Sequence, residues 1–164
     1  LPRAHDAYCR HILPLDVETY ADIRDALIAK YNVPLPQVFP DETYDLDRHR
    51  ASFLAFLNFL AGNLGGQTSI RVDSSWASQN ALMQAIGQFV VPDRVIRSDK
   101  LATDLPAIAS EVGYDAPSLP PDAGAAVPFS LQEVVTPEIE SACEKAYRRD
   151  YVMFGFSSWK QPKP

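Results

Sequence analysis

The sequence has little that would suit it to a membrane, a nucleic acid or a metal. Its 164 residues include only two cysteines, Cys9 and Cys143, without the close spacing of zinc motifs. No apolar run approaches the ~20 residues that a membrane-spanning helix needs. Basic residues number 15 against 21 acidic ones, and the net charge of −6 argues against a nucleic-acid-binding surface. We therefore expect no metal, no membrane span and no nucleic-acid partner, and a cytoplasmic location in which both thiols stay reduced and buried.

What the chain does have is enough apolar sequence for a folded core. Hydrophobic residues make up 46% of it and charged residues 22%, which is typical of globular proteins. A chain of this length suits a single domain of ordinary size. We therefore expect one domain over residues 1–164, with irregular loops at 32–46, which holds three prolines, and at 114–130, which is rich in Pro, Ala and Gly.

Apolar periodicity predicts helices along most of the chain. The strongest prediction covers residues 47–63, where Phe and Leu side chains leave the helix apolar nearly all round and therefore central. The last helix begins after Thr136, a good N-cap, with Pro137 in its first position and Gly155 at its end. Other helices are predicted at 1–13, 16–31, 78–89 and 103–112.

One short segment, Arg-Val-Ile-Arg-Ser at 94–98, is the only strand that the sequence predicts. A helix follows it, which is the order found in an α/β unit. A lone strand cannot pair its own backbone groups, and the chain opens at Leu1 in the middle of a predicted helix. Both features lead us to expect the C-terminal part of a longer α/β domain, mostly helical in this part and with its partner strands outside this sequence.

Two segments near the end of the chain resemble the carbohydrate sulfotransferases, including the bacterial nodulation type. The ending at 147–156, Tyr-Arg-Arg-Asp-Tyr-Val-Met-Phe-Gly-Phe, resembles the family's Tyr-x-x-Asp-Tyr-x-x-Phe-Gly-Tyr. The segment at 94–105 resembles the family's Ile-Gly-Arg-Phe-Glu-x-Leu-x-x-Asp-Phe. The residues at the corresponding places in that match are Ile96, Arg97, Asp99, Leu101 and Asp104.

Two earlier segments resemble the same family. Trp76-Ala-Ser-Gln79 is similar to His-Trp-x-Pro-Gln, which follows a helix rich in Phe and Leu in the family as it does here. The start of the chain is similar to the end of Arg-Asp-Pro-x-x-Arg-x-x-Ser-Ala-Tyr, with Arg3 on the second arginine and Tyr8 on the tyrosine. All four matches occur in the family's order, which makes the set more specific than any one of them.

The resemblance implies a P-loop-like α/β fold and a sulfotransferase activity. The reaction would move a sulfuryl group from 3′-phosphoadenosine-5′-phosphosulfate to a hydroxyl of a carbohydrate or small metabolite. The resemblance places the donor against Arg3 and the acceptor against Ser75, Trp76 and Gln79, and it implies no metal. Positioning and charge stabilisation would supply most of the rate acceleration.

The sequence departs from the family at three places. It has no Gly-rich strand-to-helix turn that could bind the phosphosulfate. Asp6 occupies the position of a phosphate-binding serine, and its carboxylate repels a phosphate dianion. Ser75 replaces the family's histidine, so the general base is unknown, with Asp73, Asp99 and His49 as candidates. These departures motivate the alternative of a catalytically degenerate relative that acts as a binding or assembly module. A helical interaction domain that shares the pattern by chance is the third possibility.

Several of these residues also have a purely structural interpretation. His5 and His11 lie near one helix face without a third metal ligand, so we expect packing or surface positions for them. His49 is expected at a solvated helix start with paired charges. The run Arg148-Arg149-Asp150 could bind phosphate, but we expect a solvated helix face with a capping or ion-pair role for Asp150. Trp76 suits the core as well as it suits an acceptor cleft.

Overall fold

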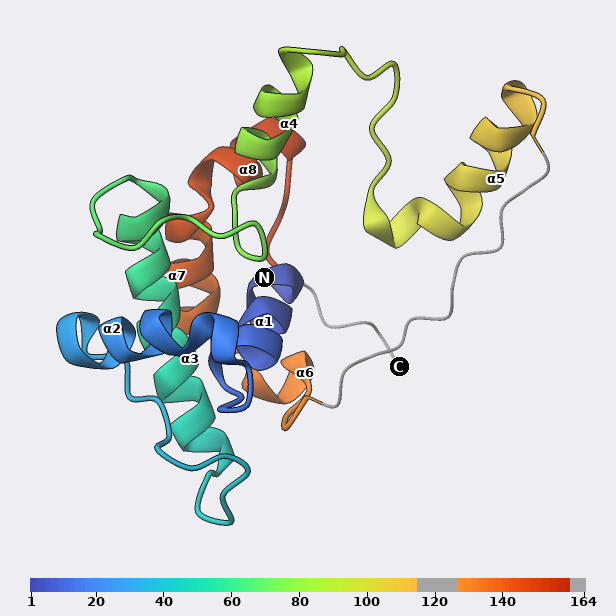
Figure 1. Ribbon diagram of the computed structural model, residues 1–164. Helices are drawn as coiled ribbons and strands as arrows, with labels where there is room; N and C mark the ends of the chain where they lie inside the picture. Colours follow the sequence, from blue (N-terminus) through green and yellow to red (C-terminus); the bar gives the residue numbers. More distant parts are fainter. Residues whose placement is uncertain (115–126, 160–164) are drawn as a thin grey trace. The chain divides into compact units, whose positions relative to one another are not determined.

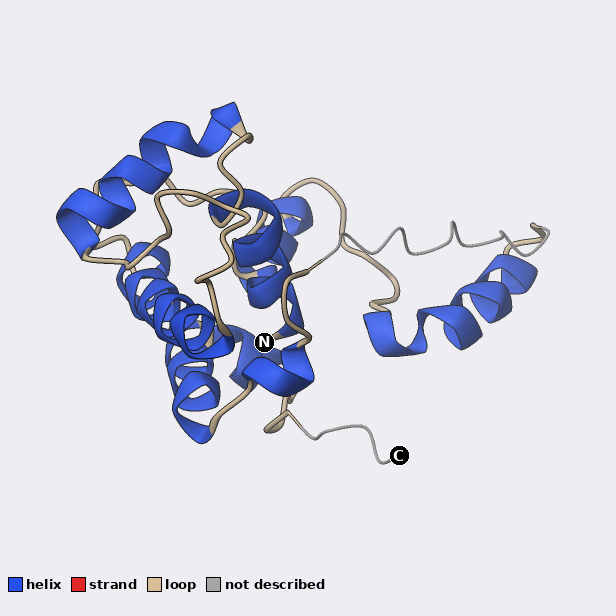
Figure 2. Cartoon of the chain, turned by 90° about the horizontal axis from the view of Figure 1, so that it is seen from below, coloured by secondary structure: helices blue, strands red, loops and turns tan. Residues whose placement is uncertain are grey.

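The computed structural model describes residues 1–114 and 127–159, and every regular element in these ranges is a helix (Figure 1). Figure 2 shows no strand in the described chain. The expected α/β P-loop fold is therefore wrong for these residues, which are all-α. None of the described helices combines the length and the apolar character needed to cross a membrane. The α-helices are α1 (Pro2–Ala7), α2 (Ala21–Tyr31), α3 (Leu46–Leu64), α4 (Gln79–Gly87), α5 (Leu101–Glu111), α6 (Leu131–Val134), α7 (Pro137–Ala146) and α8 (Arg148–Phe154).

The predicted strand at 94–98 does not form, because no described segment pairs with it. Val95 is 58% exposed, and a short 3-10 helix, Ser98–Lys100, begins where the strand was expected to end. Arg94 pairs with Glu111 of α5 at 2.7 Å. Branched side chains favour a strand only where a neighbouring strand and a packed face are present, and neither is found within the described residues.

The chain divides into two compact units, which are described separately. The first unit contains residues 1–82 together with the described residues from 127 onward, and the second begins at Met83. A single domain over 1–164 stays a prediction. Residues 32–45 contain no helix, whereas most of the loop expected at 114–130 lies outside the described residues.

Helix α3 forms the centre of the first unit. The side chain of Asp45 caps it by accepting a hydrogen bond from the backbone N–H of Arg48 at 2.9 Å. Because α3 is apolar nearly all round, it packs against several partners at once: α7 lies along it most extensively, and α2 and α6 also contact it (Figure 1). Its fully buried apolar side chains are Phe53, Phe56, Leu57 and Leu60.

Helix α1 continues directly into a π-helical turn, Tyr8–Ile12. The backbone N–H of Leu13 donates to the carbonyl oxygen of Tyr8, five residues earlier, at 2.9 Å. Tyr8, Ile12 and Leu13 are fully buried in the core of the first unit. Such π-turns inside helices are rare and are frequent at functional sites.

The predicted C-terminal helix is in fact two helices, α7 and α8, which meet at Tyr147. The hydroxyl of Tyr147 donates to the backbone carbonyl of Trp76 at 2.9 Å, and its backbone (φ −106°, ψ 27°) leaves the helical region. The predicted N-cap is confirmed, because Thr136 accepts from the N–H of Ile139. The predicted end is also confirmed, because Gly155 adopts the left-handed conformation (φ +63°) that terminates α8.

Candidate functional site

The four residues predicted to bind donor and acceptor lie close together in the first unit. Arg3 connects α1 to the turn at 74–77: its Nη2 donates to the carbonyl oxygen of Ser74 at 2.7 Å, and its Nε donates to that of Ser75 at 3.4 Å. Both contacts are made to backbone atoms. The guanidinium group thus fixes the turn against α1.

Trp76 is a core residue with no exposed surface. Its indole N–H donates to the side-chain oxygen of Asn63 at 3.0 Å, and its ring packs edge-on against Phe56 with centroids 6.0 Å apart. A side chain in this position cannot touch an acceptor in this conformation. Of the two interpretations of Trp76, the structure supports the core one.

Gln79 begins α4, and Asp150 of α8 caps that helix start. The carboxylate of Asp150 accepts from the hydroxyl of Ser78 at 2.6 Å and from the backbone N–H groups of Gln79 and Asn80, both at 2.9 Å. Asp150 is 3% exposed. Of the two roles expected for Asp150, the structure shows capping, and the helix that it caps is a different one from its own; the solvated position expected for it is wrong.

The space at this junction is small. A cavity of about 40 Å³ is lined by Arg3 and Gln79 together with Tyr147, which lies between α7 and α8, and Asp150 of α8. Pockets for small molecules usually measure ~300–1,000 Å³. The structure therefore brings the predicted residues together in a packed junction that has no room for a nucleotide or a sugar. A larger hollow of about 420 Å³ is lined by 34–38, Tyr44 and Arg48.

Neither Asp73 nor His49, two of the candidate general bases, lines the small cavity at this junction. Asp73 accepts hydrogen bonds from the hydroxyl of Tyr20 at 3.1 Å and from the N–H of Ser75 at 2.8 Å, so it stabilises the turn. His49 lies elsewhere in the core, and the side chain of Asp99 is outside the described part of the structure.

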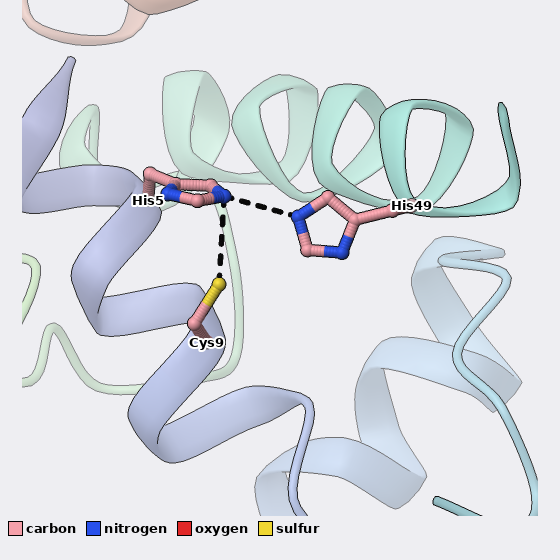
Figure 3. Close-up of side chains that lie close together, drawn as sticks. All are labelled: His5, Cys9 and His49. Carbon is pink, nitrogen blue, oxygen red and sulfur yellow. Dashed lines mark hydrogen bonds between the residues drawn. The ribbon is translucent and has the colours of Figure 1, made fainter. Parts of the chain in front are cut away.

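A second group of side chains, unexpected from the sequence, is buried between α1 and α3. His5 Nε2 lies 3.0 Å from His49 Nε2 and 3.5 Å from Cys9 Sγ, and Figure 3 shows both contacts converging on the same ring nitrogen of His5. The exposed fractions of His5, Cys9 and His49 are 4%, 6% and 0%. The prediction of a solvated position for His49 is therefore wrong. We call these three residues the His–Cys–His cluster.

The cluster continues into a chain of buried hydroxyl groups. The Nδ1 of His49 lies 3.2 Å from the hydroxyl of Tyr44, which lies 3.1 Å from the hydroxyl of Tyr8. The hydroxyl of Tyr8 donates to Ser52 Oγ at 2.7 Å. Each of these buried polar side chains thus has a hydrogen-bond partner, as buried groups require. Tyr44 also lines the larger hollow.

Burial sets the protonation of the cluster in the absence of a ligand. It lowers the pKa of His49 to about 4, with a smaller contribution from the charge of His5. It lowers the pKa of His5, against the opposing effect of Asp6. It raises the pKa of the Cys9 thiol to about 12, and Asp6 adds to this rise. At neutral pH both imidazoles are therefore uncharged, which is the form in which histidine binds metals.

The sequence carried only part of the signal for this cluster. His5 and Cys9 are four residues apart, which places them on one face of a helix. His11, which the sequence places near the same helix face as His5, instead stacks on Tyr20 with ring centroids 4.9 Å apart. His49 joins the cluster only because α1 packs on α3, a tertiary contact that no local pattern predicts.

Comparison with protein-family models, curated proteins and solved structures finds no match to this chain.

Proposed function

We propose that this chain is a catalytically degenerate relative of the carbohydrate sulfotransferases that acts as a helical binding or assembly module. One observation carries the proposal: the residues that the resemblance assigns to donor and acceptor are engaged in internal contacts. Arg3 is bonded to backbone carbonyls, Trp76 is fully buried, and the cavity beside Gln79 measures about 40 Å³. A cytoplasmic location is part of the proposal, and the free, buried Cys9 and Cys143 support it.

Sulfuryl transfer is the second candidate, and a specific observation favours it. Three of the four segments that resemble the family meet at one junction, although they are far apart in the chain: 1–8, 76–79 and 147–156. In this alternative, Arg3 would release the backbone carbonyls to bind 3′-phosphoadenosine-5′-phosphosulfate. A carbohydrate or small metabolite would then bind against Ser75, Trp76 and Gln79 after the turn opens.

A titration with adenosine 3′,5′-bisphosphate, monitored by calorimetry and by NMR, distinguishes the two candidate functions. For the binding or assembly module we expect no saturable binding up to millimolar ligand. The Arg3→Met variant tests whether any binding uses the predicted residue. Arg10→Met is the matched control, because it removes one arginine charge from the π-helical turn that continues α1. Saturable binding that Arg3→Met weakens at least tenfold, and Arg10→Met does not, would overturn the degenerate assignment in favour of the transferase.

A further inference from the structure

We propose that His5, Cys9 and His49 bind one monovalent copper ion, Cu(I), in the core of the first unit. The proposal does not depend on a relation to sulfotransferases. It starts from the donor set, because two imidazole nitrogens and a sulfur lie within 4.8 Å of one another and all three residues are buried. Imidazole and thiolate are the ligands that copper prefers over oxygen donors.

The spacing of the donors is close to that of a metal site. Metal–nitrogen bonds of ~2.0 Å and metal–sulfur bonds of ~2.3 Å place donor atoms on one ion about 3.3–3.8 Å apart. The present separations are 3.0 Å between the two Nε2 atoms and 3.5 Å from His5 Nε2 to Cys9 Sγ. The donors of His49 and Cys9 lie within 4.8 Å of each other. Rotations of the two rings and of the thiol that widen the first separation and bring this third pair into the same range would admit the ion.

The outer contacts of His49 already suit a bound ion. A histidine that ligates through one ring nitrogen usually donates a hydrogen bond from the other, which fixes the orientation of the ring. Here Nε2 faces the cluster, and Nδ1 lies 3.2 Å from the hydroxyl of Tyr44. Tyr44 is held in turn by Tyr8. These contacts hold the His49 imidazole with Nε2 directed toward His5 (Figure 3).

Charge and ligand number favour Cu(I) over zinc. On binding, the Cys9 thiol loses its proton to solvent, a copper–sulfur bond forms, and the oxidation state of the metal does not change. One thiolate cancels the charge of Cu(I), whereas Zn²⁺ would leave a net positive charge beside the rings of Phe53 and Phe129, and a buried unpaired charge is costly. Structural zinc also takes four ligands, and the described residues provide three.

Anaerobic titration of the full metal-free chain with Cu(I), in competition with a chromophoric Cu(I) chelator, tests the proposal. We expect one equivalent to bind, with the ultraviolet charge-transfer band of a copper–thiolate bond. X-ray absorption should show one sulfur and two nitrogen neighbours. Cys9→Ser and His49→Gln should each lower the affinity by more than the ~10–100-fold that loss of an outer hydrogen-bond partner costs, and Tyr44→Phe should lower it within that range.

The chain offers matched controls for both ligand types. Cys143→Ser removes the other buried free thiol, and His11→Gln removes a histidine that stacks on Tyr20 outside the cluster. Both variants should bind copper within about threefold of the parent chain. Circular dichroism of each metal-free variant identifies any that fail to fold, and the X-ray absorption result on the parent chain stands without them.

Several outcomes would overturn the assignment. The first is the absence of stoichiometric binding, and the second is a copper site with no sulfur neighbour or with two. The third is a copper affinity that falls in Cys143→Ser and not in Cys9→Ser. A parallel titration with Zn²⁺ and with Co²⁺ as its spectroscopic substitute completes the test. Tighter binding of zinc than of Cu(I), with a four-coordinate Co²⁺ spectrum, would keep a metal site and reject copper as its occupant.

Discussion

Single polar residues organise the first unit when they are buried with several partners. Asp150 is the clearest case: this residue of α8 accepts three hydrogen bonds from donors at the start of α4. The same principle operates in the His–Cys–His cluster, where each side chain has its orientation fixed by another. The sequence favoured a capping or ion-pair role for Asp150, but the identity of the capped helix depends on a contact across 70 residues of chain.

Replacing Asp150 should therefore be costly. Asp150→Ala leaves the half-buried hydroxyl of Ser78 and the buried N–H of Asn80 without this acceptor, so we expect the free energy of unfolding to fall by about 2–4 kcal/mol. Asp150→Asn keeps one acceptor oxygen and should lose about half as much. Urea denaturation followed by circular dichroism at neutral pH measures both. Asp25→Ala, an exposed position within α2, is the control and should change stability by less than about 0.5 kcal/mol; an equal loss in this control would contradict the capping argument.

Whole elements were predictable where the signals are local. The central helix expected at 47–63 is observed as Leu46–Leu64, because its apolar periodicity is strong. The start of α7 at Thr136 and the end of α8 at Gly155 follow from capping chemistry within a few residues. The prediction of a strand at 94–98 was wrong because a strand forms only when a partner strand, often distant in the sequence, pairs with it. The break at Tyr147 was missed because no local signal marks it; the hydroxyl of this residue makes a tertiary hydrogen bond to the carbonyl of Trp76.

Two glycines at the helices of the first unit should respond in opposite ways to alanine. Gly155 ends α8 with φ +63°, a conformation in which a Cβ is strained, so Gly155→Ala should lower the free energy of unfolding by about 1 kcal/mol. Gly62 lies inside α3, where an added Cβ would make an ordinary contact with the Thr68 methyl group at 3.6 Å. Gly62→Ala should therefore raise stability by about 0.5–1 kcal/mol. Thermal unfolding of both variants gives the sign of each change in stability. A shift of the melting temperature in the same direction for both would refute the opposite backbone roles assigned to the two glycines.

The two units differ in how much of their apolar surface is buried. The first unit contains nearly all of the buried hydrophobic residues among those described, and in the second unit Ala109 is the only one. Phe89 is 88% exposed and Val91 78% exposed. Composition alone did not reveal this difference, because both units are rich in apolar residues and only the tertiary contacts decide which of them are buried. The difference in burial implies a difference in local stability between the units.

Hydrogen exchange of the intact chain should reveal this difference in two helices of almost equal length. Helix α7 has 10 residues and packs along α3, with Ile139, Ala142 and Cys143 buried. Helix α5 has 11 residues, a proline inside it and one buried residue, Ala109. Because isolated helices of this length are marginal in water, protection must come from packing. We expect amides of α7 to exchange at least ~10³-fold more slowly than unstructured peptides, and those of α5 within ~10-fold of them. Mass spectrometry of peptic fragments measures both, and equal protection of the two helices would show that the second unit gains stability from contacts beyond those described.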